Sequence, residues 1–296
     1  MMQRNIRTLA GIAMLMGSQT ACERVVGLNV TEGPTLLVVE ARLEVRRVQE
    51  RPEGPALSPQ AIRLTTTAPY FTNVAAPPAR GAVVQVIDDA GRSVSMSEVP
   101  ERPGTYFASD LPIAVGRRYT LRIQWDGEQY EATERVHTAV PIDSLYFVAR
   151  PNQSPATEGL RATIDLVDPP AIANYYLWEQ WVDGARQLSP DTATRTRAVR
   201  DDEIASGRVV RRFQPYIDIR VRSGQVVQLR QYAISSAAYA YYFAFNSEIS
   251  GDGSPFAAPS ANLRGNVGNR TNPRKRALGY YIASEYSERV RTVPEP

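Results

Sequence analysis

The sequence has few of the residues that catalysis and covalent cross-linking most often use: among 296 residues there is one cysteine, Cys22, and one histidine, His137. A single cysteine excludes an internal disulfide, so hydrophobic cores must stabilise the fold, for which a chain of this length suffices. A single histidine excludes histidine-based catalytic triads and multi-histidine metal sites. There is also no glycine-rich loop of the kind that holds phosphates. We therefore expect no cofactor and no metal ion.

Lysine is equally scarce. Lys275 is the only lysine, so arginine makes up the rest of the 34 basic residues. The formal net charge of +3 falls to +1 if residues 1–21 are removed, because this segment holds two arginines and no acidic residue. A nearly neutral chain argues against nucleic acid as a partner.

The first 21 residues have the parts of a secretory signal, in the expected order. Arg4 and Arg7 give a positive start, residues 9–16 are apolar, and residues 17–21 are small or polar. The apolar run is far shorter than the roughly 20 residues that span a bilayer. We expect a signal peptide over residues 1–21.

The residues before Cys22 distinguish two ways of processing this signal. Ordinary signal peptidase requires small residues one and three places before the cut, whereas the lipoprotein peptidase requires an apolar residue and two small residues before a cysteine. The segment Gln19-Thr20-Ala21-Cys22 fits the second pattern except at Gln19, which also departs from the first. The single cysteine at this position favours the lipoprotein route. Acyl chains then give a lasting membrane anchor, at about 0.8 kcal/mol per buried methylene. We expect a lipid anchor at Cys22 and a tether over residues 22–34.

The first half of the mature chain has the alternating pattern of half-buried strands. Residues 39–46 place Val, Ala, Leu and Val on one face and charged residues on the other. Residues 81–94 read as a strand, a turn at 88–91 and the start of another strand, and residues 119–133 as a hairpin that turns at Asp126-Gly127. Residues 47–60 form a polar loop. We expect an immunoglobulin-like β-sandwich over residues 35–140.

The second half, residues 141–296, is predicted to be a second β-rich domain with one amphipathic helix. Its strands include one that begins near 145, a hairpin over 216–232 that turns at Ser223-Gly224, and a last strand over 277–291. Between them, apolar residues recur at steps of three and four over residues 235–249, which is the pattern of an amphipathic helix. Ser235 or Ser236 can cap its start. The following segment, 250–276, is too rich in Gly, Pro and Asn for regular structure.

Few residues indicate a catalytic, metal-binding or ligand-binding role. His137 is interpreted as an ordinary polar strand residue, and the acidic run 201–203 as a solvated turn rather than a calcium site. The carboxylates could include a glycosidase pair, although sequence does not show which of them face each other. The Tyr241, Tyr242 and Phe245 stripe of the helix is expected to pack in a core, with a surface that stacks a sugar or peptide as the alternative.

The segments described above, in their order along the chain, resemble the lipoproteins known as domain of unknown function 4249, which are found in the Bacteroidota. The resemblance covers nearly the whole mature chain and is most specific at "VPIDSLYF" and "SGDGSPFAAPSANLRGN". It implies a β-rich protein with an immunoglobulin-like front half. The genes of this family often lie beside those of TonB-dependent outer-membrane transporters. The resemblance therefore implies an accessory role at the outer membrane, and it supplies no catalytic residues.

Two functions follow as hypotheses. The first is a non-catalytic outer-membrane lipoprotein that acts as an accessory or binding module of a TonB-dependent transport system. Its partners would be the membrane, through Cys22, and an outer-membrane β-barrel transporter, with Phe256 and Leu263 in the contact loop. The second is a surface carbohydrate-active hydrolase with paired carboxylates. Whether the protein faces the periplasm or the cell surface is left open.

Overall fold

The computed structural model describes residues 33–50, 59–68, 74–149, 159–170, 172–187, 197–200, 207–249 and 263–295, with the backbone alone at 197–200 and 247–249. It divides into Met1–Pro34 and Thr35–Pro296, and the fold below is that of the second unit. The predicted signal peptide, Cys22, the acidic run 201–203 and Phe256 lie outside the described residues. They remain predictions.

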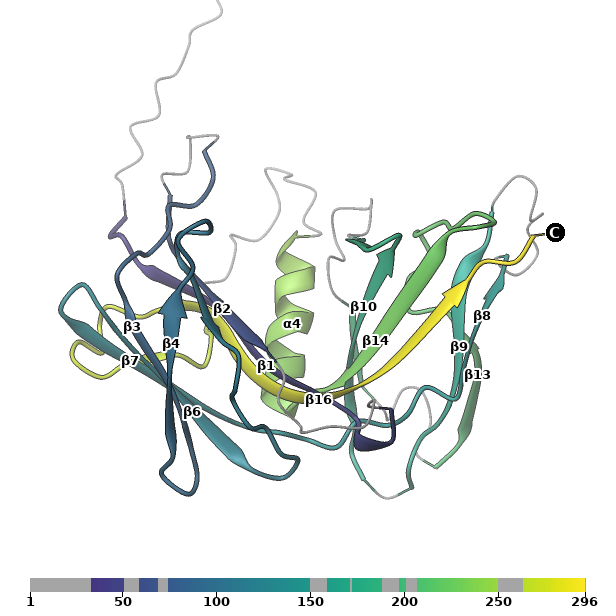
Figure 1. The fold of residues 1–296 in the computed structure, drawn as a ribbon, viewed down its shortest axis with the longest axis horizontal. Coiled ribbons are helices and arrows are strands. Elements are labelled where there is room, and N and C mark those ends of the chain that lie inside the picture. Colours follow the sequence, from purple (N-terminus) through teal and green to yellow (C-terminus); the bar gives the residue numbers. More distant parts are fainter. Residues whose placement is uncertain are drawn as a thin grey trace, which may run out of the picture. The chain divides into compact units, whose positions relative to one another are not determined.

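The structure is mainly β, as predicted (Figure 1). The first half contains seven strands and a short 3-10 helix: β1 (Leu37–Arg46), η1 (Val48–Glu50), β2 (Gln60–Thr66), β3 (Val83–Asp88), β4 (Ser93–Glu98), β5 (Thr105–Ala108), β6 (Arg118–Trp125) and β7 (Glu128–Arg135). The second half contains β8 (Ser144–Val148), β9 (Arg161–Val167), β10 (Tyr175–Val182), β11 (Ala185–Arg186), β12 (Arg197–Arg200), β13 (Val209–Phe213), β14 (Val226–Ala233), α4 (Ser236–Ile249), β15 (Gly268–Asn269) and β16 (Leu278–Thr292).

Most strands belong to one hydrogen-bonded series in the order β11-β10-β14-β16-β1-β2-β5-β4-β3-β6-β7-β15, with β12 also paired to β10. A separate three-stranded sheet has the order β13-β9-β8. The long strand β16 joins the two halves, because it pairs in parallel with β1 and antiparallel with β14 (Figure 1).

The first half is a β-sandwich whose strands alternate as the sequence predicts. In β1, Val39, Ala41, Leu43 and Val45 are buried in a core that also takes residues from β2, β3, β5, β6 and β7. The hairpin of β6 and β7 turns at Asp126 and Gly127, whose φ values of 52° and 73° are those of a tight turn with two left-handed residues. The sandwich core is not built from the first half alone. Tyr281 and Ala283 of β16 and Val267 also belong to it.

The second half has its own core, formed by residues of β8, β9, β10 and β14. The turn at 223–224 is present, but the prediction of a strand before it was wrong. Residues 214–222 make only an isolated bridge between Val221 and Leu160. The reason is that the buried guanidinium of Arg161 donates to the carbonyl of Ile217 at 2.8 Å, which uses backbone that a strand would pair. The apolar side chains of this segment enter the second core instead, among them Tyr216 and Ile219.

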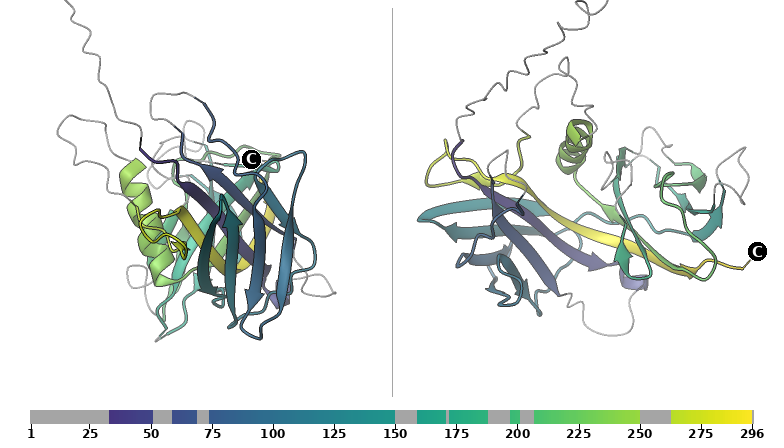
Figure 2. Two further views of the ribbon diagram at one scale, coloured as in Figure 1. Left: turned by 90° about the vertical axis from the view of Figure 1, so that its left-hand side faces the viewer. Right: turned by 90° about the horizontal axis from the view of Figure 1, so that it is seen from above.

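The predicted helix is present as α4. Ser235 caps it, since its Oγ accepts the backbone N–H of Ala238 at 3.1 Å. The helix lies over the face of the large sheet made by β10, β14 and β16 (Figure 2). Tyr241 and Tyr242 pack there on a third core with Leu177, Tyr232 and Ile282. The predicted packing of Tyr241 and Tyr242 is confirmed. Phe245 is half-buried and stacks on Tyr241 with ring centroids 6.2 Å apart.

Candidate ligand pocket

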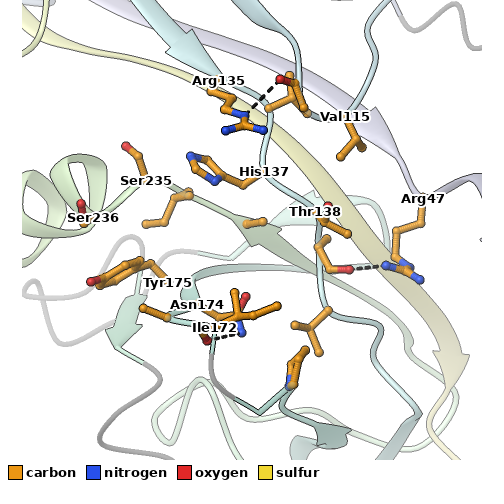
Figure 3. Close-up of a pocket in the computed structure, with 18 of the residues that line it drawn as sticks. Arg47, Val115, Arg135, His137, Thr138, Ile172, Asn174, Tyr175, Ser235 and Ser236 are labelled. Carbon is orange, nitrogen blue, oxygen red and sulfur yellow. Dashed lines mark hydrogen bonds between the residues drawn. The ribbon is translucent and has the colours of Figure 1, made fainter. Parts of the chain in front are cut away.

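A pocket of about 600 Å³ opens where the last residues of β7 meet the ends of β10 and β14 (Figure 3). Its walls are residues 135–141, residues 172–175 before and at the start of β10, residues 233–236 at the start of α4, and Arg47, Val115, Gly116 and Pro169. Pockets of about 300–1,000 Å³ with apolar walls and a few polar groups are the usual sites of small ligands.

The connection between the two halves forms one wall, and β16 holds it in place. The backbone N–H of Ala139 donates to the carboxylate of Glu285 at 2.9 Å. The backbone N–H of Ile142 donates to the hydroxyl of Ser287 at 2.8 Å. Both acceptor side chains are buried in the sheet. The "VPID" segment is therefore shaped by polar side chains of the last strand rather than by strand pairing of its own.

Among the residues that the structure describes, the ionisable groups lining the pocket are basic or neutral, and none of them is a carboxylate. Arg47 is compensated: its guanidinium donates to the carbonyl of Ala139 and lies 3.7 Å from Glu50 and 3.8 Å from Glu285. Arg135 donates from Nε to the carbonyl of Gly116 at 3.0 Å. Within the described part of the chain, Arg135 has no ion pair.

His137 lies two residues after Arg135 and also lines the pocket (Figure 3). The backbone there makes an isolated parallel bridge with Ser284 rather than a regular strand. Desolvation lowers the pKa of the His137 imidazole, and the nearby charge of Arg135 lowers it further. The sequence analysis interpreted His137 as a strand residue, and this was wrong because residue 137 makes only an isolated bridge.

A second group of polar residues lies on the α4 side of the large sheet and includes the carboxylates of Glu44 and Glu179. Both accept the hydroxyl of Tyr232, at 3.4 Å and 3.3 Å. Arg42 pairs with both of them, at 3.2 Å and 2.9 Å. Burial raises the pKa of Glu179, but the attraction of Arg42 and Arg186 outweighs it, so the net pKa is lowered. Glu179 is thus held as an anion, which is the opposite of what a glycosidase acid requires.

Desolvation raises the pKa of the Glu134 carboxyl group. It accepts the Asn266 amide at 2.9 Å and the Tyr280 hydroxyl at 3.3 Å. Within the described part of the chain, the groups that bond to Glu134 are amides and hydroxyls, and none of them is a second carboxyl group that could work with it as an acid–base pair. Among the described residues, no three or more His, Cys, Asp or Glu side chains are placed to hold a metal ion. Over the same residues, no helix combines the length and apolarity needed to cross a membrane.

The pocket was not predicted from the sequence. Of the predicted contact loop, Leu263 is described and is half-buried, and Phe256 is not described. Arg135, Asn174 and Ser235 come from three distant segments, so no local motif connects them. The one local signal was the "PID" junction, which the sequence analysis marked as specific and which does line the pocket at Pro141.

Comparisons with known proteins give a family but no activity. The model of the family described as "Domain of unknown function (DUF4249)" matches residues 26–289. No curated protein matches the chain. Among solved structures, the chain is similar to the "Crystal structure of chicken CNTN1 FN1-FN3 domains" at 10% identity and a TM-score of 0.21. That match covers 66% of this chain, and this chain spans 59% of the length of the chicken protein chain.

Proposed function

Because the chain belongs to the family described as Domain of unknown function (DUF4249), we propose that it is a non-catalytic lipoprotein of the outer membrane. In this proposal Cys22 carries the lipid anchor. The folded part, which begins near Thr35, binds a ligand as an accessory module of a TonB-dependent transport system.

The observation that carries the binding role is the pocket between the two halves. Its size suits a small ligand, and its walls combine apolar side chains with neutral polar groups and the guanidinium of Arg135, which has no ion pair among the described residues. Such a lining favours binding over reaction, since the imidazole of His137 makes no hydrogen bond to a hydroxyl or carboxylate among the described residues.

The alternative of a carbohydrate-active hydrolase has less support. Glu44 and Glu179, which share the hydroxyl of Tyr232, are both paired with Arg42, and Arg230 also pairs with Glu44 at 3.3 Å. A carboxylate that is held ionised by arginine does not donate the proton that the leaving group of a glycoside requires.

The experiment is affinity purification of the full-length protein from detergent-solubilised outer membrane, together with membrane fractionation. We expect an outer-membrane β-barrel to co-purify and the wild-type protein to sediment with membranes. The Cys22→Ser variant lacks the thiol that receives diacylglycerol, so it should appear in the soluble fraction. A Ser variant that sediments like wild type contradicts the anchor, and a wild type that brings down no barrel contradicts the accessory role.

A deletion tests the predicted contact loop separately. Removing Gly253 to Ala261 should leave a folded, membrane-bound protein that no longer co-purifies with the barrel. Co-purification that survives the deletion would assign the contact to another surface.

A further inference from the structure

One wall of the pocket carries two basic side chains on the same side of the backbone. Arg135 and His137 are both exposed, whereas Val136 between them is buried in the sandwich core. This alternation is that of extended chain, in which residues two apart share a face. Figure 3 shows the two side chains near each other on one wall, with Ser235 and Tyr175 on other parts of the pocket.

The guanidinium of Arg135 is held in place and still has free donors. Its Nε donates to the carbonyl of Gly116, which leaves the two terminal nitrogens available. The preceding residue, Glu134, forms no ion pair with it, and the carboxylate of Glu134 is bonded instead to Asn266, Tyr280 and Ser235. Arg135 is therefore a fixed positive charge without a counter-ion among the described residues.

The rest of the lining suits the body of an organic ligand. Val115, Ile172 and Ile234 supply apolar surface, and Asn174 supplies an amide next to Ile172. Asn174 is itself oriented, since its side-chain N–H donates to the carbonyl of Ile172 at 3.0 Å. A positive group at the edge of an apolar pocket selects a ligand that has an anionic end and an apolar body.

We propose that the pocket binds a small organic oxyanion, with its carboxylate or phosphate on Arg135 and His137 and its apolar body against Val115, Ile172 and Ile234. This proposal rests on the proposed function and names the class of ligand. A planar guanidinium fits either oxyanion through two parallel hydrogen bonds. His137 adds a further donor, and a full positive charge when it is protonated.

The single histidine makes the test direct, because the imidazole signals in an NMR spectrum of this protein come from His137 alone. The probes are N-acetylleucinate, its uncharged counterpart N-acetylleucinamide, and inorganic phosphate, each titrated at fixed ionic strength. We expect N-acetylleucinate to shift the His137 signals saturably and to raise the pKa of His137, since a bound anion favours the imidazolium. The amide should bind at least about tenfold more weakly, as expected when a charge-assisted hydrogen bond is lost.

Two variants assign the effect to Arg135. Arg135→Gln should weaken binding of the acid by at least about tenfold and leave binding of the amide unchanged. Arg102→Gln removes a charge from an exposed turn that does not line the pocket, so it should bind like wild type. Phosphate tests the apolar part of the proposal: binding weaker than that of the acid supports a contribution of the apolar body, and binding as tight as that of the acid contradicts that part.

Three results would overturn the proposal. They are equal binding of acid and amide, an Arg135→Gln variant that binds the acid normally, or no saturable shift of His137 with N-acetylleucinate or phosphate. None of these depends on the co-purification experiment. A protein that brings down a β-barrel but shows no such shift would keep the proposed accessory role and lose the assigned ligand class.

Discussion

Arg42 of β1 and Glu179 of β10, which are 137 positions apart in the sequence, form an ion pair of 2.9 Å on the α4 side of the large sheet. The side chain of Glu179 is 3% exposed, and the guanidinium of Arg42 lies 4.7 Å from the centre of the Tyr232 ring. β1 and β10 are not neighbours, because β16 and β14 lie between them. This pair therefore connects the sandwich to the second half across two intervening strands.

Loss of the buried carboxylate should destabilise the fold strongly. Glu179→Gln keeps the shape of the side chain but removes the carboxylate that Arg42 and Arg186 share, so that Arg42 keeps only its pair with Glu44, and we expect a loss of about 3 kcal/mol in the free energy of unfolding. The matched control is Glu40→Gln, since Glu40 pairs with Arg63 at 3.9 Å and both side chains are more than half exposed. We expect that control to cost less than about 1 kcal/mol in urea unfolding. Equal losses in the two variants would contradict a structural role for the buried pair.

The same pair predicts the direction of the pH dependence. Because the folded-state pKa of Glu179 lies below its ordinary value, the pair stabilises the protein above the unfolded-state pKa of about 4.5. This contribution is lost as the pH falls through the folded-state pKa. The urea midpoint of the wild type should therefore decrease below pH 4.5, and the Glu179→Gln variant should show a smaller decrease. Parallel curves for the two proteins would contradict the assignment.

Gly279 should be intolerant of any side chain. Its φ is +83°, and a Cβ there would lie 2.1 Å from the carbonyl oxygen of Val39, which is its partner residue in the parallel pairing of β1 and β16. Gly279→Ala should cost the left-handed strain of about 1–2 kcal/mol and in addition the displacement of β1. Gly91→Ala is the control, because Gly91 has a similar φ of +82° and open space around it. Thermal unfolding should separate the two variants by several degrees, and similar melting temperatures would mean that β1 and β16 can move apart at no cost.

Two phenylalanines of α4 give a matched comparison of buried and exposed surface. Phe245 is half-buried and stacks on Tyr241, whereas Phe243 is 57% exposed. Phe245→Ala should cost about 1–3 kcal/mol, and Phe243→Ala less than about 1 kcal/mol, because the transfer free energy follows the apolar area removed from water. If Phe243→Ala proves the more costly, the outer face of the helix is covered by another part of the protein.

The sequence alone determined those features that depend on neighbours along the chain. Alternation at 39–46 identified the buried face of β1, Asp126-Gly127 identified a hairpin, and three- and four-residue steps after Ser235 identified α4, because each pattern reports locally which side of an element avoids water. The same local signal misled at 216–222, where apolar side chains enter the second core without forming a strand.

Only the tertiary structure decided which elements meet. The local sequence of β1 and β16 does not predict that the first and last strands pair in parallel. It also does not predict that Arg42 pairs with Glu179, or that Arg135, Asn174 and Ser235 line one pocket. Periodicity gives the face that a strand buries but not the strand that covers it. The pairing of strands depends on contacts between residues that are distant in sequence. These contacts stabilise the fold only after the entropy cost of closing the loops between them has been met.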